Sequence, residues 1–193
     1  SVRQVAMIDN EGNVAAHTGD SGIAHASHRR GNGYSVQANM MLTDRVPAAM
    51  AAAYEKAAGD LADRMLAALE AAEAAGGDIR GRQSAAILIV SGSASEEPWR
   101  DVVMDLRVED HPRPVEELKR LVILHRAYEY ENLGDEAMAE NDLAAALEAY
   151  GEAARLAPDN LEIAFWQGVS LLNVGRDEEG LAIVKRVVER DPH

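Results

Sequence analysis

The sequence predicts an α+β domain followed by an all-α region, and two observations carry this prediction. Up to residue 113, short runs with strand-type alternation and turn residues are mixed with helical segments, which is typical of a sheet covered by helices. From Pro114 onward the hydrophobic spacing is continuously helical. We therefore expect two domains, at residues 1–113 and residues 114–193.

The chain opens with the pattern of a β-hairpin. Val5, Met7, Val14 and Ala16 alternate with other residues, as side chains of half-buried strands do. The segment between them, residues 9–13, reads Asp-Asn-Glu-Gly-Asn and has the composition of a turn. We expect two antiparallel strands joined at this turn.

Ser1 stands at the start of this hairpin. In an N-terminal-nucleophile hydrolase, the terminal amine accepts the proton of its own residue's hydroxyl, so one residue supplies both nucleophile and base. Ser1 fits that chemistry. The alternative is that Ser1 only marks where a fragment begins.

Further elements of the first half follow from the same spacing rules. A helix with Pro47 in its first turn is expected to be capped at Thr43-Asp44, and Gly59 is expected to break the helical region in two. The glycine pair at residues 76–77 ends that region. The other expected elements are a strand over residues 33–37, a buried strand over residues 84–90 and a strand over residues 102–108.

The last of these strands has two different faces. Val103, Asp105 and Arg107 share one face, because side chains two apart in a strand point the same way. The alternate positions are apolar: Val102, Met104, Leu106 and Val108. The sheet is therefore expected to have one apolar and one polar face here.

The composition excludes several classes of function. The 193 residues include 19 Lys and Arg against 33 Asp and Glu, a formal charge of -14 that disfavours nucleic-acid and membrane partners. Without cysteine, the chain cannot form disulfides, thiolate nucleophiles or Cys-ligated metal sites. Because the chain has no cysteine, nothing ties it to an oxidising compartment, and we expect a cytoplasmic protein. No apolar run approaches the roughly 20 residues of a membrane span. We expect no cofactor.

Polar residues beside glycines at strand ends form the candidate site. A rigid sheet can aim a guanidinium or an amide from such a position at a substrate carbonyl or carboxylate. Alternatively, the arginines of the loop before residue 84 pair with surrounding acids, which is the preferred interpretation for Arg80. The candidate residues are His17, Thr18, Gln37, Asn39, Arg82, Gln83, Ser84, Asp105, Arg107 and His111.

The histidines do not predict a metal site. His25 and His28 stand three apart with His17 nearby, but they fall in a Gly-rich segment expected to be a loop. No helix aligns the two rings, and no glutamate accompanies them in a metalloprotease pattern. We expect no bound metal.

Five blocks of the first half resemble an uncharacterised bacterial and archaeal family with an N-terminal-nucleophile-hydrolase-like fold. The blocks are Arg3-Gln4-Val-Ala, Asp9-x-x-Gly12-x-Val-Ala-Ala-His-Thr-Gly19, Gly33-Tyr34-x-Val-Gln37-x-Asn39, Gly76-Gly-Asp-x-Arg-Gly-Arg-Gln-Ser-Ala85 and Asp105-Leu-Arg-Val-x-Asp-His111. They occur in order over roughly the first 126 residues. The resemblance implies a four-layer αββα sandwich, of which this chain would form part. Some members carry a peptidoglycan-binding region after the domain, and helical repeats take that place here.

The chain departs from this family in two respects. Many members have Gln-Gly-Asn where this chain has Gln37-Ala-Asn39. Members also begin with a further segment that does not precede Ser1 here. If the nucleophile belongs to that segment, the chain is a fragment whose sheet exposes an unpaired edge. If a precursor cuts itself before Ser1, the chain is a mature subunit.

A second resemblance concerns about 20 residues. The mature subunit of asparaginase-type enzymes also opens with a nucleophilic hydroxyl residue, an apolar strand, Asp-x-x-Gly-Asn-Val-Ala-Ala and a Thr-Gly-rich segment. Here the nucleophile would be serine instead of threonine, and the usual Thr-Gly-Gly is replaced by Thr18-Gly-Asp-Ser-Gly22.

The second half contains an internal repeat that resembles tetratricopeptide repeats over residues 127–191. Pro158 and Pro192 are 34 residues apart, and small residues at equivalent positions, Gly134 with Gly168 and Ala146 with Gly180, are expected to let paired helices approach closely. A linking helix over residues 114–126 is expected to precede two repeats. The repeats either bind a peptide or only cap the fold.

These patterns support two functional hypotheses. The first is an amide-bond hydrolase acting on a small amide or a peptide, in which Ser1 attacks and Asn39, Thr18 or Arg82 binds the oxyanion or the substrate. The second is a non-enzymatic scaffold whose acidic repeats bind a basic or apolar peptide or mediate homo-oligomerisation.

Overall fold

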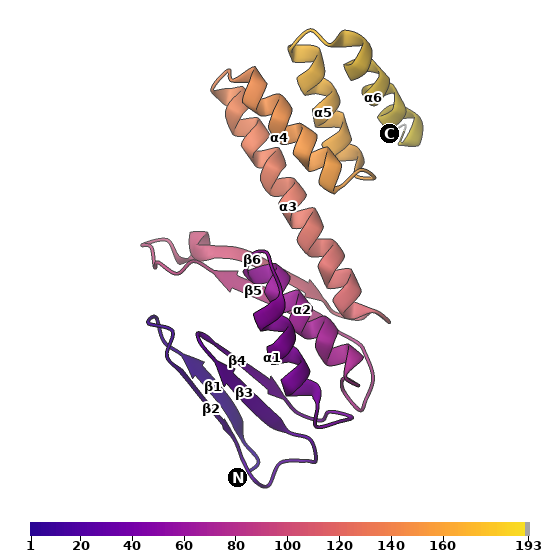
Figure 1. The fold of residues 1–193 in the computed structure, drawn as a ribbon. Coiled ribbons are helices and arrows are strands. Elements are labelled where there is room, and N and C mark those ends of the chain that lie inside the picture. Colours follow the sequence, from indigo (N-terminus) through magenta and orange to yellow (C-terminus); the bar gives the residue numbers. More distant parts are fainter. Residues whose placement is uncertain (192–193) are drawn as a thin grey trace. The chain divides into compact units, whose positions relative to one another are not determined.

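The computed structural model describes residues 1–191 and has the expected α+β class, with small sheets and a helical C-terminal region (Figure 1). The chain divides into two compact units, Ser1–Lys119 and Arg120–His193. Over the described range, no helix is both long and apolar enough to cross a membrane.

The strands of the first unit form two-stranded antiparallel sheets (Figure 1). The pairs are β1 (Gln4–Ile8) with β2 (Val14–Thr18), β3 (Ser27–Gly31) with β4 (Tyr34–Ala38), and β5 (Ala85–Val90) with β6 (Val102–Val108). Within the described residues, each of these strands therefore has one strand partner and one edge without a strand beside it.

The predicted turn between β1 and β2 is confirmed. The Asp9 carboxylate accepts the backbone N–H groups of Glu11 and Asn13 at 3.0 and 2.8 Å. The hydrogen bonds from Asn13 lower the pKa of the Asp9 carboxyl. Gly12 has a φ of +83°, a conformation that glycine adopts without steric cost.

The face of β1 that carries Val5 and Met7 is exposed, although its apolar side chains predict that it is buried. Val5 and Met7 are 47% and 70% exposed, whereas Gln4 and Ala6 are partly buried. The expectation that Val5 and Met7 lie on the buried side of a half-buried strand was therefore wrong. The physical reason is that the Gln4 side chain donates hydrogen bonds to groups in three other strands.

Strand β3 was not expected, because its sequence Ser-His-Arg-Arg-Gly lacks apolar alternation. It forms by pairing with β4, which covers the predicted strand at residues 33–37 with a shift of one residue. His28 therefore lies in a strand, and its assignment to a loop was wrong.

Helix α1 (Val46–Lys56) packs on the face of β3–β4 that carries Tyr34. The rings of Tyr34 and Tyr54 lie 4.6 Å apart, and the Tyr34 hydroxyl donates to Glu55 at 2.5 Å, which raises the pKa of Tyr34 to about 12. The β1–β2 hairpin packs on β3–β4 from the side of His28, which bonds to Thr18. Two β layers and one α layer result.

Helix α2 (Leu61–Ala74) follows the predicted break at Gly59 and ends before the predicted glycine stop at residues 76–77. Its N-cap is Asp60, which accepts the backbone N–H of Asp63 at 3.0 Å. The predicted cap of α1 at Thr43 was wrong, because the Thr43 hydroxyl donates instead to the carbonyl of Ala75 at 2.8 Å.

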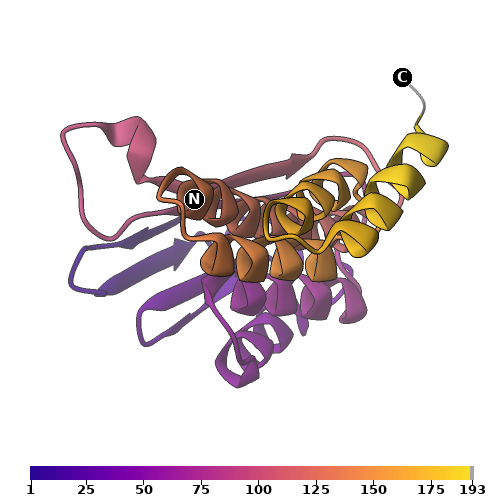
Figure 2. The same cartoon turned by 90° about the horizontal axis from the view of Figure 1, so that it is seen from above.

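The second unit consists of helical hairpins, and the first of their helices, α3, begins in the last residues of the first unit (Figures 1 and 2). The separate linking helix expected over residues 114–126 is instead continuous with the first helix of the repeats. The helices are α3 (Pro114–Ala139), α4 (Leu143–Leu156), α5 (Leu161–Asn173) and α6 (Asp177–Arg190). The predicted equivalence of Pro158 with Pro192 involves a position outside the described residues.

Glycines allow the close helix approach predicted for the repeats. A Cβ on Gly134 would lie 2.7 Å from the Tyr150 ring, and a Cβ on Gly180 would lie 2.7 Å from the carbonyl oxygen of Gly168. Ala127, Ala153 and Ile163 are fully buried in the core of this unit. Close packing of buried side chains between the helices therefore stabilises the repeats.

Candidate functional site

The predicted site residues fall into two groups in the first unit. One group lies at the base of the first two hairpins: Ser1, His17, Thr18, Gln37 and Asn39. The other lies on and beside β5 and β6: Arg82, Gln83, Ser84, Asp105, Arg107 and His111. Among the described residues, no hydrogen bond or ion pair joins the two groups, and the roles of all of these residues stay predictions.

A hydrogen-bond network connects the strands in the first group. Gln4 and Thr18 are register partners in β1–β2, and Gln4 Nε2 donates to Thr18 Oγ1 at 3.0 Å. The same nitrogen lies 3.2 Å from the carbonyl oxygens of Ser27 and Ala38, which are register partners in β3–β4. Thr18 Oγ1 lies 2.8 Å from His28 Nδ1. The network therefore joins β1, β2, β3 and β4.

A pocket of about 330 Å³ borders this network. Thr18 and His28 line it, together with Asp20, Ile23 and other residues of the Gly-rich segment before β3. Volumes of about 300 to 1,000 Å³ are typical of small-molecule sites. The polar network therefore has an adjoining space in which a small ligand fits.

Ser1 lies beside the segment that follows β2. Its hydroxyl accepts the backbone N–H of Arg3 at 3.2 Å, and its amine lies 3.5 Å from Ser21 Oγ. Its carbonyl accepts the N–H of Ser21 at 3.0 Å. A Cβ on Gly19 would lie 2.1 Å from the Ser1 carbonyl oxygen, so glycine is required for this approach.

The remaining residues of the first group are less connected. His17 lies on the exposed face of β2, and Asn39 is exposed directly after β4. Gln37 on β4 donates from its side-chain amide to the Ser35 hydroxyl. Thr18 is thus the predicted residue of this group that occupies the network.

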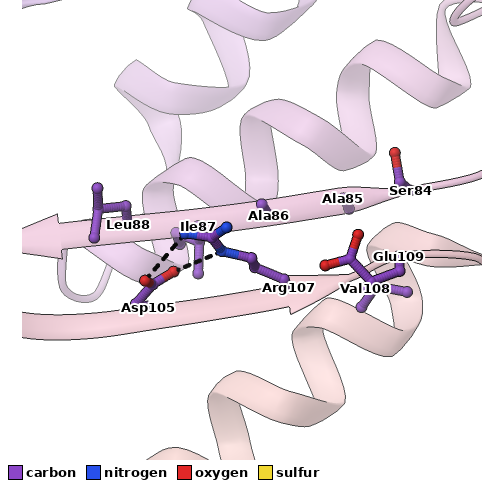
Figure 3. Close-up of a pocket in the computed structure, with 9 residues that line it drawn as sticks. All are labelled: Ser84, Ala85, Ala86, Ile87, Leu88, Asp105, Arg107, Val108 and Glu109. Carbon is purple, nitrogen blue, oxygen red and sulfur yellow. Dashed lines mark hydrogen bonds and ion pairs between the residues drawn. The ribbon is translucent and has the colours of Figure 1, made fainter.

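Three residues of the second group, Ser84, Asp105 and Arg107, line a pocket of about 490 Å³ (Figure 3). Arg107 Nε lies 3.1 Å from Asp105 Oδ1, and Figure 3 shows the two side chains directed toward each other along β6. This ion pair raises the pKa of Arg107. Both side chains are exposed, as the predicted polar face requires, and an exposed pair of this kind contributes little stability.

The loop before β5 holds its arginines in ion pairs. Arg80 pairs with Asp78 at 2.6 Å, which lowers the pKa of Asp78 to about 2, in agreement with the preferred interpretation of Arg80. Arg82 Nε lies 3.5 Å from Glu73. The backbone carbonyl of Gln83 accepts the N–H of His111 at 2.8 Å. Ser84 lines the pocket beside Asp105 and Arg107.

The repeats contain a smaller pocket of about 160 Å³. Asp135 and Met138 of α3 and Trp166 and Val169 of α5 line it, together with Tyr150 of α4. The Tyr150 hydroxyl donates to Asp135 at 2.5 Å, and burial together with this bond raises the pKa of Tyr150. The pocket is therefore mainly apolar, with one carboxylate at its side.

Comparison with known families decides the membership of the chain. Residues 1–118 match the family model described as "Family of unknown function (DUF1028)", which is more than half of the chain. The chain belongs to the DUF1028 family. Residues 137–193 match a tetratricopeptide repeat model, so the DUF1028 domain is followed by a repeat region of a kind that serves in protein interaction.

A solved DUF1028 protein has a similar structure. It is protein SPO2555 from Silicibacter pomeroyi, which is 30% identical to this chain with a TM-score of 0.50. The alignment covers 62% of this chain and 48% of that chain, so this chain spans about half of the length of the solved protein. No match was found among curated proteins.

Two polar residues of the DUF1028 domain network were missed as site candidates. In the sequence, Gln4 stands out only as part of a family motif, and His28 only as a candidate metal ligand. The available signal was the hairpin itself: a five-residue turn over 9–13 places Gln4 opposite Thr18, so a polar pair at an inward position was foreseeable. Among the described residues of the DUF1028 domain and the repeats, no cluster of three His or carboxylate side chains is suited to hold a metal.

Proposed function

We propose that the repeat region docks a peptide segment of another protein that carries both basic and apolar side chains. The observation that carries this proposal is the pocket between α3, α4 and α5, which combines exposed apolar surface with the carboxylate of Asp135. The DUF1028 domain would then be the scaffold to which this binding region is attached.

The apolar part of the site comes from two helices. Met138 of α3 and Val169 of α5 line the pocket, and Trp166 is 40% exposed beside them. Tryptophan contributes large contact areas at interfaces and binds cations over its ring. A leucine or a methylene chain of a partner residue matches the pocket volume of about 160 Å³.

The acidic part comes from carboxylates that crowd one another. Glu131 is 7% exposed, and its pKa is raised by burial and by the nearby carboxylates of Glu162 and Asp135. From residue 120 onward the sequence has 15 Asp and Glu against 7 Lys and Arg. A lysine or arginine of the partner would lower this repulsion, because an opposite charge favours the ionised carboxylates.

Peptide titration tests the proposal. Fluorescein-labelled peptides of alternating Lys and Leu, and of alternating Glu and Leu, are titrated with the full chain in fluorescence anisotropy. We expect saturable binding of the Lys-Leu peptide, weakened at high salt, and no binding of the Glu-Leu peptide. Asp135→Asn and Trp166→Ala should each weaken binding of the Lys-Leu peptide by about tenfold or more.

The matched control is Glu148→Gln, which removes an exposed carboxylate of α4 that does not line the pocket. It should leave the affinity within about twofold, since screened surface charges contribute little. An equal loss of peptide affinity in Glu148→Gln and Asp135→Asn would indicate unspecific attraction to the net charge. That result would contradict docking in the pocket between α3, α4 and α5.

Amide hydrolysis by Ser1 is the second candidate. What supports it is the stacking of two β layers beside α1, which matches three layers of the αββα sandwich that the family resemblance implies. The amine and hydroxyl of Ser1 are also both held at the base of the first hairpin. The test is mass analysis of the full-length gene product, as wild type and as Ser1→Ala. Cutting before Ser1 that the substitution abolishes would support the hydrolase, and an uncut wild type would contradict it.

A further inference from the structure

The polar network of the DUF1028 domain holds a hydroxyl against an imidazole. Thr18 Oγ1 and His28 Nδ1 are 2.8 Å apart, within the reach of a nucleophile and its base. They come from β2 and β3, which lie on different hairpins, so the pair depends on tertiary structure. Both side chains are partly buried.

The contacts of Gln4 determine which atom accepts the hydrogen bond of the Thr18 hydroxyl. Carbonyl oxygens only accept hydrogen bonds, so the atom of Gln4 that faces the Ser27 and Ala38 carbonyls is the amide nitrogen. This nitrogen also lies 3.0 Å from Thr18 Oγ1, so its two hydrogens are shared among three acceptors. Because an amide nitrogen does not accept a hydrogen bond, the hydroxyl proton of Thr18 is directed to another acceptor. In the tautomer of His28 with its proton on Nε2, that acceptor is Nδ1.

The pair is accessible from the pocket of about 330 Å³ that both residues line. Among the described residues lining this pocket, Asp20 is the one carboxylate. A small carbonyl compound in this pocket would therefore lie beside both Thr18 and His28.

We propose that Thr18 is a nucleophile for ester or amide carbonyls and that His28 is its general base. Thr18 Oγ1 forms a bond to the carbonyl carbon while its proton moves to His28 Nδ1. The bond from that carbon to the leaving oxygen or nitrogen then breaks, and the leaving group takes the proton from His28. Water hydrolyses the acyl-threonine ester, which releases the acid and restores the hydroxyl. This reaction uses a different hydroxyl from Ser1 and is independent of peptide docking by the repeats.

A fluorophosphonate probe tests the pair in the full chain. Thr18 Oγ1 would form a bond to phosphorus, fluoride would leave with the electrons of the P–F bond, and the proton would pass to His28. We expect one adduct per chain by intact mass, on the peptide that contains Thr18. Thr18→Ser should retain labelling, Thr18→Ala should abolish it, and His28→Asn should slow it by about 100-fold or more.

Two control variants lie outside this pocket. Thr43→Ala removes a hydroxyl that donates to Ala75, and His125→Asn removes an imidazole of α3; both should label at the wild-type rate. The wild-type adduct decides the proposal even if His28→Asn fails to fold. Absence of an adduct, an adduct on Ser1 in place of Thr18, or an unchanged rate in folded His28→Asn would overturn it.

Discussion

The DUF1028 domain and the repeat region hold their elements together by different means. In the domain, the amide of Gln4 and the Thr18–His28 bond connect two hairpins, while apolar side chains such as Met7 and Leu88 are more than half exposed. In the repeats, Ile163 is fully buried and Gly168 and Gly180 bring two helices into contact. The link between the two hairpins of the domain therefore depends on a few directional hydrogen bonds, and the pairing of the repeat helices depends on packed volume.

Loss of buried volume should have the largest effect, and it should fall on the repeats. Ile163→Ala removes a fully buried side chain, so we expect the free energy of unfolding of the repeats to fall by about 2 to 5 kcal/mol. Urea unfolding followed by circular dichroism measures it. Val188→Ala, at a position 54% exposed in the same unit, should change it by less than about 1 kcal/mol. Equal losses would contradict a volume-packed core.

Added volume sharpens the same contrast, and the chain offers a matched pair of helical glycines. A Cβ at Gly168 would lie 2.9 Å from a Val184 methyl carbon and 3.2 Å from the Gly180 carbonyl oxygen, so Gly168→Ala should cost about 1 to 3 kcal/mol. Gly151 has open space at this position, so Gly151→Ala should gain up to about 1 kcal/mol from helix propensity. Thermal melting of both variants shows whether each substitution raises or lowers the stability. Stabilisation by Gly168→Ala would contradict the close approach of the helices that carry Gly168 and Gly180.

The domain should respond instead to loss of a hydrogen-bond donor. Gln4→Ala leaves two partly buried carbonyls and the Thr18 hydroxyl without their donor, which should cost about 1 to 3 kcal/mol. Hydrogen exchange of β1 to β4 should accelerate while exchange in α5 stays unchanged. Gln83→Ala, at an exposed position, is the control and should alter neither. Unchanged exchange in β1 to β4 would contradict the network's role.

The smallest expected effect concerns the buried carboxylate of the repeats. The pKa of Glu131 is raised above its usual 4.5, so the folded state binds this proton more tightly than the unfolded state. Its stabilising contribution is complete below about pH 4.5 and is lost as the pH rises through the folded-state pKa. Glu131→Gln should therefore flatten the pH dependence of urea unfolding relative to Glu148→Gln. Parallel curves for the two variants would contradict a raised pKa at Glu131.

Local patterns predicted much of the fold. Strands β5 and β6, the break at Gly59 and the close helices at Gly134 and Gly180 all follow from side-chain alternation, turn chemistry or residue size within short windows. The predicted burial of the β5 strand was wrong, because Leu88 and Val90 are 56% and 57% exposed on the face opposite Ile87. Strand β3 did not follow, because only pairing with β4 makes its polar residues extended.

The candidate site was predictable only in part, because its contacts are distant in sequence. Thr18 was foreseen as a site residue, but its partner His28 is 10 residues away on another hairpin. The Thr43 hydroxyl binds a carbonyl 32 residues away and so does not cap α1 as its position predicts. Which polar groups meet is decided by tertiary packing, which spacing along the chain does not encode.

Docking in the repeats is tested most directly by backbone amide chemical shifts of the labelled full chain during titration with the Lys-Leu peptide. We predict that the chemical-shift changes are concentrated at Met138, Trp166 and Asn173, which line the pocket of the repeats. The strands of the DUF1028 domain should show no change. Shifts centred on β1 to β6, or no shifts with the peptide in excess, would contradict the proposal that the repeats are the binding region of this protein.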